Sequence, residues 1–273
     1  MKRIEQKFQD LKEKNQCAFI GYICAGDPNY DTSLKILKEL PKAGCDIIEL
    51  GVPFLDPAGD GPIIENASKR AIANGASLVK TLKMAAEFRK DDSATPLILM
   101  SYYNPILTYG LDKIFADAHQ SGIDGVLIVD LPLEEEKEIL TDIKKSNLDL
   151  IKLIAPTTSQ DRTKEIAKNA SGFLYQISML GITGTKSADL SDNEKKVKNL
   201  KEISNLPIGI GFGIKTPKQA GEFAKIGTDA VIIGSTIVQE INDGFITKKS
   251  SDEIVSNVTK KVLEFSKEIK QLS

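Results

Sequence analysis

The chain has 273 residues, 41% hydrophobic and 27% charged, which is the composition of a globular protein with a substantial core. Its 36 Lys and Arg balance 38 Asp and Glu to a formal net charge of -2, so no basic surface typical of nucleic-acid or membrane binding is expected. The sequence holds neither a signal peptide nor an apolar run of the roughly 20 residues that cross a bilayer. We therefore expect a cytoplasmic protein with neither nucleic-acid nor membrane partners.

The cysteines and the histidine form no recognisable disulfide or metal pattern. Cys17, Cys24 and Cys45 are odd in number and lie in apolar or strand-like stretches, as expected for small buried side chains in a reducing compartment. The single histidine, His119, lies near a predicted helix end without His or Cys companions at zinc-ligand spacing. We expect no metal site.

Helical and strand-like segments alternate along the chain. Residues 1–16 predict a charged amphipathic helix. Short apolar runs rich in β-branched residues predict eight strands, at 18–24, 46–50, 96–102, 125–130, 149–155, 172–178, 207–212 and 229–235. Segments of helical character lie between and after them, at 31–43, 65–74, 80–95, 111–121, 133–146, 159–169, 191–204, 216–226 and 252–270.

Eight repeats of a strand followed by a helix predict the α/β fold class. Strands that are apolar nearly throughout belong to parallel sheets covered on both faces. A chain of this length with eight such units favours a closed (β/α)8 TIM barrel, with extra helices at the N-terminus and after strand two. An open doubly wound sheet is the alternative. No low-complexity linker divides the chain, so we expect residues 1–273 to form a single barrel domain.

A carboxylate at the end of the second strand is the first candidate catalytic group. Period-two alternation places Glu49 on the same side as Ile47, so it points into the barrel mouth if Ile48 and Leu50 face the helices. Active sites of such barrels lie at the C-terminal ends of the strands. Burial there without a cation raises a glutamate pKa toward neutrality, which suits acid–base catalysis. A carboxylate satisfied by hydrogen bonds within the barrel is the structural alternative.

A second carboxylate, Asp60, follows in a loop that proline and glycine interrupt. An aspartate in "GDGP" is often only a turn former. The loop begins after Glu49, however, and must therefore lie over the same barrel mouth. The two acids together are candidates for an acid–base pair.

Glycine-rich stretches in the second half predict an anion site. "GFGIKTP" (211–217) follows strand seven, "GSTIVQE" (234–240) follows strand eight, and each opens a helix. Glycines allow close approach of the backbone, helix N-termini attract anions, and phosphate sites recur here in TIM barrels. With "GITGTKS" (181–187), they predict a phosphorylated substrate unless the glycines serve only tight turns. The long polar stretch 181–196 is either a lid or a surface loop.

The motifs also occur in an order that characterises one known family. The chain carries "AGDP" (25–28), "ELGVPFLDPAGDGP" (49–62), "NPILTYG" (104–110), "DLPLEE" (130–135), "IAPTT" (154–158), "GITG" (181–184), "GFGI" (211–214) and "IIGSTIV" (232–238). In this combination the sequence resembles the α subunit of tryptophan synthase over nearly its whole length. The resemblance implies a TIM-barrel lyase of tryptophan biosynthesis that cleaves indole-3-glycerol phosphate to indole and glyceraldehyde 3-phosphate by a retro-aldol reaction.

The resemblance implies roles for individual residues. Glu49 matches the general acid/base, Asp60 the group that accepts the indole N–H and stabilises the cationic indolenine, and Tyr175 a residue beside the reacting centre. Thr183 matches a lid residue that bonds Asp60 on closure. Four matching positions hold the substrate phosphate: Gly184, Gly213, Gly234 and Ser235. Four others line an apolar slot for the indole ring: Tyr22, Met100, Leu127 and Phe212.

A partner is implied as well. Members of the family join a tryptophan synthase β subunit, which carries pyridoxal phosphate, in an α2β2 heterotetramer and pass indole to it through a tunnel; no cofactor is expected on this chain. The positions that match the family's partner-facing loops are Asp56, Pro57, Asn104 and Pro132.

The chain departs from the family at four positions. Leu55 stands where Ser is common and Gly59 where Ala is common. Val129 stands where Pro is common and Met179 where Arg is common. These departures concern loop order and coupling to the β subunit and leave the chemistry intact. Gly59 precedes Asp60 in the loop that follows Glu49, which we call the acidic loop. We expect this glycine to make the acidic loop more mobile in the chain without its partner.

Two other functions compete with this interpretation. A Schiff-base aldolase on the same fold would use Lys152, in the fifth strand, as its amine nucleophile. Indole-3-glycerol phosphate has no carbonyl that forms such an imine, and a solvated or strand-end lysine is the plainer interpretation. A non-enzymatic subunit kept only to activate its partner is the other possibility, which the presence of Glu49 and Asp60 disfavours.

Overall fold

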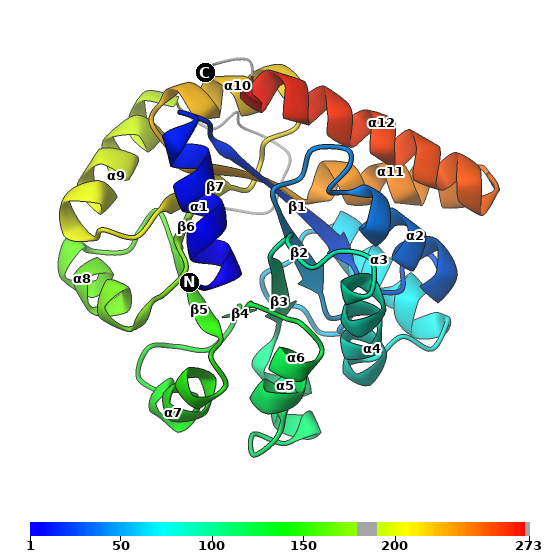
Figure 1. Cartoon of the computed structure of the whole chain (residues 1–273), viewed down its shortest axis with the longest axis horizontal. Coiled ribbons are helices and arrows are strands. Elements are labelled where there is room, and N and C mark those ends of the chain that lie inside the picture. The colour runs from blue at the N-terminus through cyan, green and yellow to red at the C-terminus, as the bar shows by residue number, and fades with distance from the viewer. Residues whose placement is uncertain (179–189, 271–273) are drawn as a thin grey trace.

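The computed structural model describes residues 1–178 and 190–270, and its eight strands form one closed parallel barrel. Each strand pairs with the next in chain order, and β8 pairs with β1. Figure 1 shows the strands at the centre of the molecule with helices around them. The strands are β1 (Ala18–Cys24), β2 (Ile47–Gly51), β3 (Leu97–Ser101), β4 (Gly125–Ile128), β5 (Asp149–Ile154), β6 (Leu174–Ile177), β7 (Ile208–Gly211) and β8 (Ala230–Ile233). The predicted (β/α)8 barrel is thus confirmed, and the open doubly wound sheet is wrong.

Helices surround the barrel and supply its outer layer. In chain order they are α1 (Arg3–Glu13), α2 (Tyr30–Glu39), α3 (Pro62–Ala73), α4 (Leu78–Arg89), α5 (Tyr103–Tyr109), α6 (Ile114–Gln120), α7 (Lys137–Lys145), α8 (Gln160–Asn169), α9 (Leu190–Ile203), α10 (Pro217–Lys225), α11 (Ser235–Ile246) and α12 (Ser251–Lys270). The extra helices predicted at the N-terminus and after strand two are present as α1 and as α3 followed by α4. The sequence analysis missed α5, a short helix with Pro105 in its first turn, where a missing backbone N–H costs no helical hydrogen bond.

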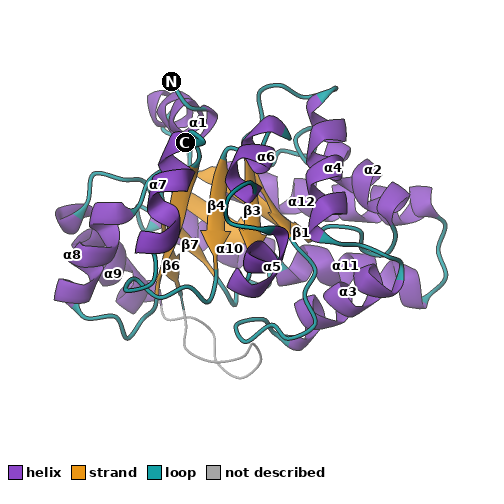
Figure 2. Cartoon of the chain, turned by 90° about the horizontal axis from the view of Figure 1, so that it is seen from below, coloured by secondary structure: helices purple, strands orange, loops and turns teal. Residues whose placement is uncertain are grey.

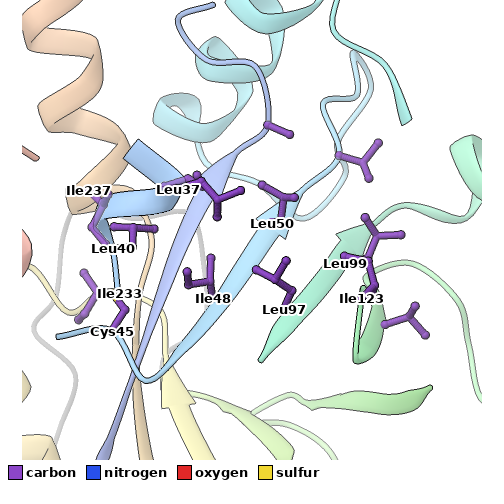
Figure 3. Close-up of a cluster of buried hydrophobic side chains, with 14 of the residues drawn as sticks. Leu37, Leu40, Cys45, Ile48, Leu50, Leu97, Leu99, Ile123, Ile233 and Ile237 are labelled. Atoms are coloured by element: carbon purple, nitrogen blue, oxygen red, sulfur yellow. The ribbon is translucent and has the colours of Figure 1, made fainter. Parts of the chain in front are cut away.

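Alternating side chains of each strand divide the core into two layers. Ile47 belongs to the cluster inside the barrel, with Ile98, Leu127 and Phe173. The neighbouring Ile48 and Leu50 belong instead to the cluster between strands and helices, as Figure 3 shows. This alternation directs Glu49 to the inner side, as its period-two position in the sequence predicted.

Helix α1 closes the amino end of the barrel. Its Phe8 ring packs against Phe173 of the interior at a centroid distance of 5.8 Å, and Arg3 forms a 2.7 Å ion pair with Asp124. Figure 2 shows α1 lying at one end of the strands. The amino end of the barrel is thus covered by α1, while the carboxyl ends of the strands border the pocket that holds Glu49. Among the described residues, no helix has both the length and the apolar character needed to span a membrane.

Candidate active site

Glu49 is a buried acid that faces the open end of the barrel. It is 1% exposed, and its backbone pairs with Tyr22 of β1 and Ile98 of β3. Its Oε1 atom has no hydrogen-bond partner among the residues that the structure describes. Burial raises the pKa of Glu49 to about 8, so the side chain carries a proton at neutral pH. A protonated, unpartnered carboxyl is suited to deliver a proton to a bound molecule.

Asp60 enters the same pocket from the loop between β2 and α3. Burial raises the pKa of Asp60 to about 6, while a hydrogen bond with the Tyr102 hydroxyl lowers it and the charge of Glu65 raises it. Asp60 is thus the stronger acid of the two and is mostly ionised at pH 7, where Glu49 is mostly protonated. Two carboxyl groups in opposite protonation states can divide acid and electrostatic roles between them.

Tyr102 is a site residue that the sequence analysis missed. It follows β3 directly, is 4% exposed, and its hydroxyl accepts a 3.1 Å hydrogen bond from the Gly59 backbone N–H. The same hydroxyl bonds Asp60, and its ring packs against Phe54 at 5.4 Å. Burial raises the pKa of Tyr102, so its hydroxyl keeps the proton that it donates to Asp60. The only sequence signal for Tyr102 is its place at the carboxyl end of a strand.

The pocket around the two acids is lined mainly by aromatic and aliphatic side chains. Tyr22, Met100, Tyr175 and Phe212 all contribute, and the rings of Tyr175 and Phe212 meet edge to face at 5.9 Å. Leu127, which was expected beside them, is not among the lining residues and is fully buried in the cluster inside the barrel. The pocket also includes residues that sequence reasoning did not select: Gly61, Ile63, Ile64, Ile214 and Ile232.

Gly213, Gly234 and Ser235 also line this pocket, and they follow β7 and β8. Gly234 is the N-cap of α11, and no capping side-chain hydrogen bond is present there among the residues that the structure describes. Backbone N–H groups of the first turn are therefore available to an anion. Gly213 has φ 75°, a left-handed conformation that favours glycine, and the preceding Phe212 has φ 74°. Such a conformation in a non-glycine residue is a form of backbone strain that occurs often at functional sites.

The glycine-rich stretch before α10 predicted a second helix N-terminus that binds an anion, and the structure does not provide it. Thr216 and Gln219 form a capping box at its start, and the Gln219 side chain also accepts the Lys215 backbone N–H. These donors are therefore satisfied within the chain. The start of α11 remains as the candidate anion site, and Gly213 lines the same pocket.

Lys152 lies outside the pocket. The neighbouring Ile151 belongs to the interior cluster, and Lys152 contacts the buried Glu136 carboxylate at the start of α7. Lys152 is 9% exposed, and burial lowers its pKa to about 8. It is thus neither solvated nor directed at the candidate substrate, and the described lining of the pocket includes no lysine. This arrangement removes the basis for a Schiff-base aldolase.

The remaining predicted residues fall into two groups. Thr183, Gly184 and Met179 lie outside the described residues, together with most of the expected lid. The expected partner-facing residues follow β2, β3 and β4: Asp56, Pro57, Asn104 and Pro132. All of these are exposed except Pro57, which is half-buried. Within the described part of the chain, no cluster of three or more His, Cys, Asp or Glu side chains is arranged to hold a metal.

Comparisons with known proteins agree with this geometry. Residues 8–272 match the family model described as tryptophan synthase alpha chain. Tryptophan synthase subunit alpha of Legionella pneumophila strain Paris is 35% identical, with 98% of each chain covered and a TM-score of 0.90. A chain of Mycobacterium tuberculosis tryptophan synthase is 29% identical, with 98% of each chain covered and a TM-score of 0.87. The chain belongs to the tryptophan synthase alpha chain family.

Proposed function

We propose that this chain cleaves indole-3-glycerol phosphate with Glu49 as the acid and base and Asp60 as the group that stabilises the cationic ring. Retro-aldol cleavage of this substrate to indole and glyceraldehyde 3-phosphate, with indole passed to a β subunit, is the activity of the family. The observation that carries the residue roles is the pairing of a protonated Glu49 with an ionised Asp60 in one pocket.

Glu49 serves both proton transfers in this mechanism. Its carboxyl proton goes to carbon three of the indole ring, which turns the ring into a cationic indolenine and leaves a carboxylate. That carboxylate then removes the proton of the glycerol hydroxyl next to the ring. The O–H electron pair becomes the carbonyl bond of the aldehyde, and the pair of the breaking carbon–carbon bond returns to the ring. The cycle ends with Glu49 protonated again, as a general acid–base must.

Asp60 accepts the ring N–H and stabilises the positive charge that appears there in the intermediate. Its pKa of about 6 keeps it ionised at neutral pH, in a pocket where a charge interacts more strongly than in water. Tyr102 orients the carboxylate through its hydroxyl. Because the ring becomes charged only during reaction, Asp60 stabilises the transition state more than the bound substrate.

Different residues of the pocket suit the two parts of the substrate. The indole ring suits the apolar walls formed by Tyr22, Met100 and Phe212. The phosphate suits the uncapped first turn of α11 at Gly234 and Ser235. The proposed steps use protein carboxyls alone, so we propose that this chain needs no cofactor of its own.

A β subunit is the proposed recipient of indole. The family works with such a subunit, and we propose an α2β2 assembly in which Asp56, Pro57, Asn104 and Pro132 face the partner. Two large apolar side chains of the same segments support a partner surface, because Leu55 is 58% and Leu107 55% exposed. Pyridoxal phosphate would belong to that partner.

Indole release from the purified chain tests the proposal. Asp60→Asn should lower kcat strongly and leave KM nearly unchanged, because the lost interaction forms during reaction. Lys152→Arg keeps a charge beside the buried Glu136 but cannot form an imine, so it should retain cleavage if the chemistry does not use the lysine amine. An Asp60→Asn enzyme with unchanged kcat and raised KM would instead make Asp60 an ordinary binding residue.

A further inference from the structure

The acidic loop touches the barrel through a glycine. The Gly59 backbone N–H donates a 3.1 Å hydrogen bond to the Tyr102 hydroxyl, which in turn bonds Asp60. A Cβ atom built at position 59 would lie 3.0 Å from Cγ1 of Val129 and 3.4 Å from the Tyr102 hydroxyl oxygen. Carbon atoms that are not bonded prefer separations of about 3.5–4.0 Å, so a side chain at position 59 meets Val129 too closely.

Val129 has little freedom to move away. Its backbone N–H donates a 2.9 Å hydrogen bond to the carbonyl of Ser101, which holds it at the end of β4. The side chain is half-buried and packs against the cluster inside the barrel. A β-branched side chain is also stiff about χ1. Gly59 is exposed on its loop, so the loop would be displaced rather than Val129.

We propose that Gly59 and Val129 form a steric pair that positions Asp60 against Tyr102. The bare Cα of Gly59 lets the acidic loop lie on Val129, and this approach brings the Gly59 N–H within reach of the Tyr102 hydroxyl. A side chain at position 59 lifts the loop away and displaces the adjacent Asp60. Both members of the pair are positioning residues, and their catalytic effect rests on the proposed role of Asp60.

This steric pair reverses the expectation that the sequence suggested for Gly59. If the glycine only loosened the loop, Gly59→Ala would restrict the chain and improve the order of the active site. If Gly59 is instead required by Val129, the same substitution must impair the site. Whether Gly59→Ala raises or lowers kcat therefore distinguishes the two explanations.

The test is a cycle of the wild-type chain, Gly59→Ala, Val129→Ala and the double variant, with kcat and KM of indole release measured for each. Contact between the two sites makes their effects non-additive. We expect Gly59→Ala to lower kcat by about tenfold or more in the wild-type chain but by less than about threefold in the Val129→Ala chain, with KM little changed. A Gly59→Ala enzyme as fast as wild type, or an equal loss in both backgrounds, would overturn the proposal.

Amide exchange at residue 59, measured by NMR, reports the steric pair without reference to catalysis. We expect faster exchange in Gly59→Ala than in wild type, and slower exchange again in the double variant. Equal exchange rates at residue 59 in all four chains would refute the steric pair. This conclusion would hold whatever kcat and KM the Asp60→Asn enzyme shows. The predicted exchange pattern combined with a fully active Asp60→Asn enzyme would leave the pair intact and refute the proposed role of Asp60. Thermal unfolding of each variant controls for loss of fold.

Discussion

The variant Glu49→Gln tests two properties of the glutamate separately: its role in catalysis and the effect of its burial on the stability of the fold. The substitution keeps the shape of the side chain and removes the titrating proton. Since general acid–base catalysis contributes roughly 10²–10⁴-fold in rate, we expect cleavage to fall by at least about a hundredfold. Retention of more than about a tenth of the wild-type activity would contradict the assignment of Glu49 as acid and base.

The same variant should become more stable relative to wild type as the pH rises. Burial raises the pKa of Glu49 from its ordinary 4.5 to about 8, so the folded chain holds this proton more tightly than the unfolded chain. The stability that this difference contributes is fully present below pH 4.5 and is lost as the pH rises toward 8. Glutamine has no such dependence. At 1.36 kcal/mol per pH unit, Glu49→Gln should gain about 2–3 kcal/mol over wild type between about pH 5.5 and 7.5.

Denaturant unfolding at several pH values measures this gain. Both chains should show the same m-value, so that the change in midpoint reports stability alone. The exposed Glu202→Gln is a matched control, since it makes the same chemical substitution at a position that folding does not bury. If the stability difference between Glu49→Gln and wild type stayed constant across this pH range, Glu49 would not have a raised pKa and the proposed acid would be ionised at neutral pH.

The other predictions concern the pH profile, the tyrosine and the partner. The plot of kcat/KM against pH should be bell-shaped, rising as Asp60 ionises near pH 6 and falling as Glu49 loses its proton near pH 8; a profile that is flat between pH 5 and 9 would contradict both roles. Tyr102→Phe removes a hydrogen bond that lowers the pKa of Asp60, so the acid limb should move to higher pH, and an unmoved limb would exclude Tyr102 as a positioning residue. A β subunit that orders the acidic loop should raise kcat by more than about tenfold, or ~1.4 kcal/mol in barrier. Equal kcat with and without the partner at saturating substrate would count against this coupling.

The sequence by itself determined the barrel and the direction of its key acid. Each strand is a short apolar run, and β1 occupies the predicted 18–24. The period-two alternation within a strand is a local property of the backbone. For that reason the orientation of Glu49 between Ile48 and Leu50 followed from its place in the chain. The Thr-x-x-Gln spacing of Thr216 and Gln219 is likewise a local feature, and it forms the capping box at the start of α10.

Only the tertiary structure decided how the loops meet over the barrel. Tyr102 bonds Gly59 across 43 positions of sequence, and Val129 approaches the same glycine from another strand end. Lys152 pairs with Glu136 because the barrel wall directs it outward, away from the pocket. The pKa values of Glu49 and Asp60 depend on burial, which the surrounding strands and loops create together. Local periodicity determines which way a side chain points, whereas the groups that it meets depend on distant segments brought together by the closed barrel.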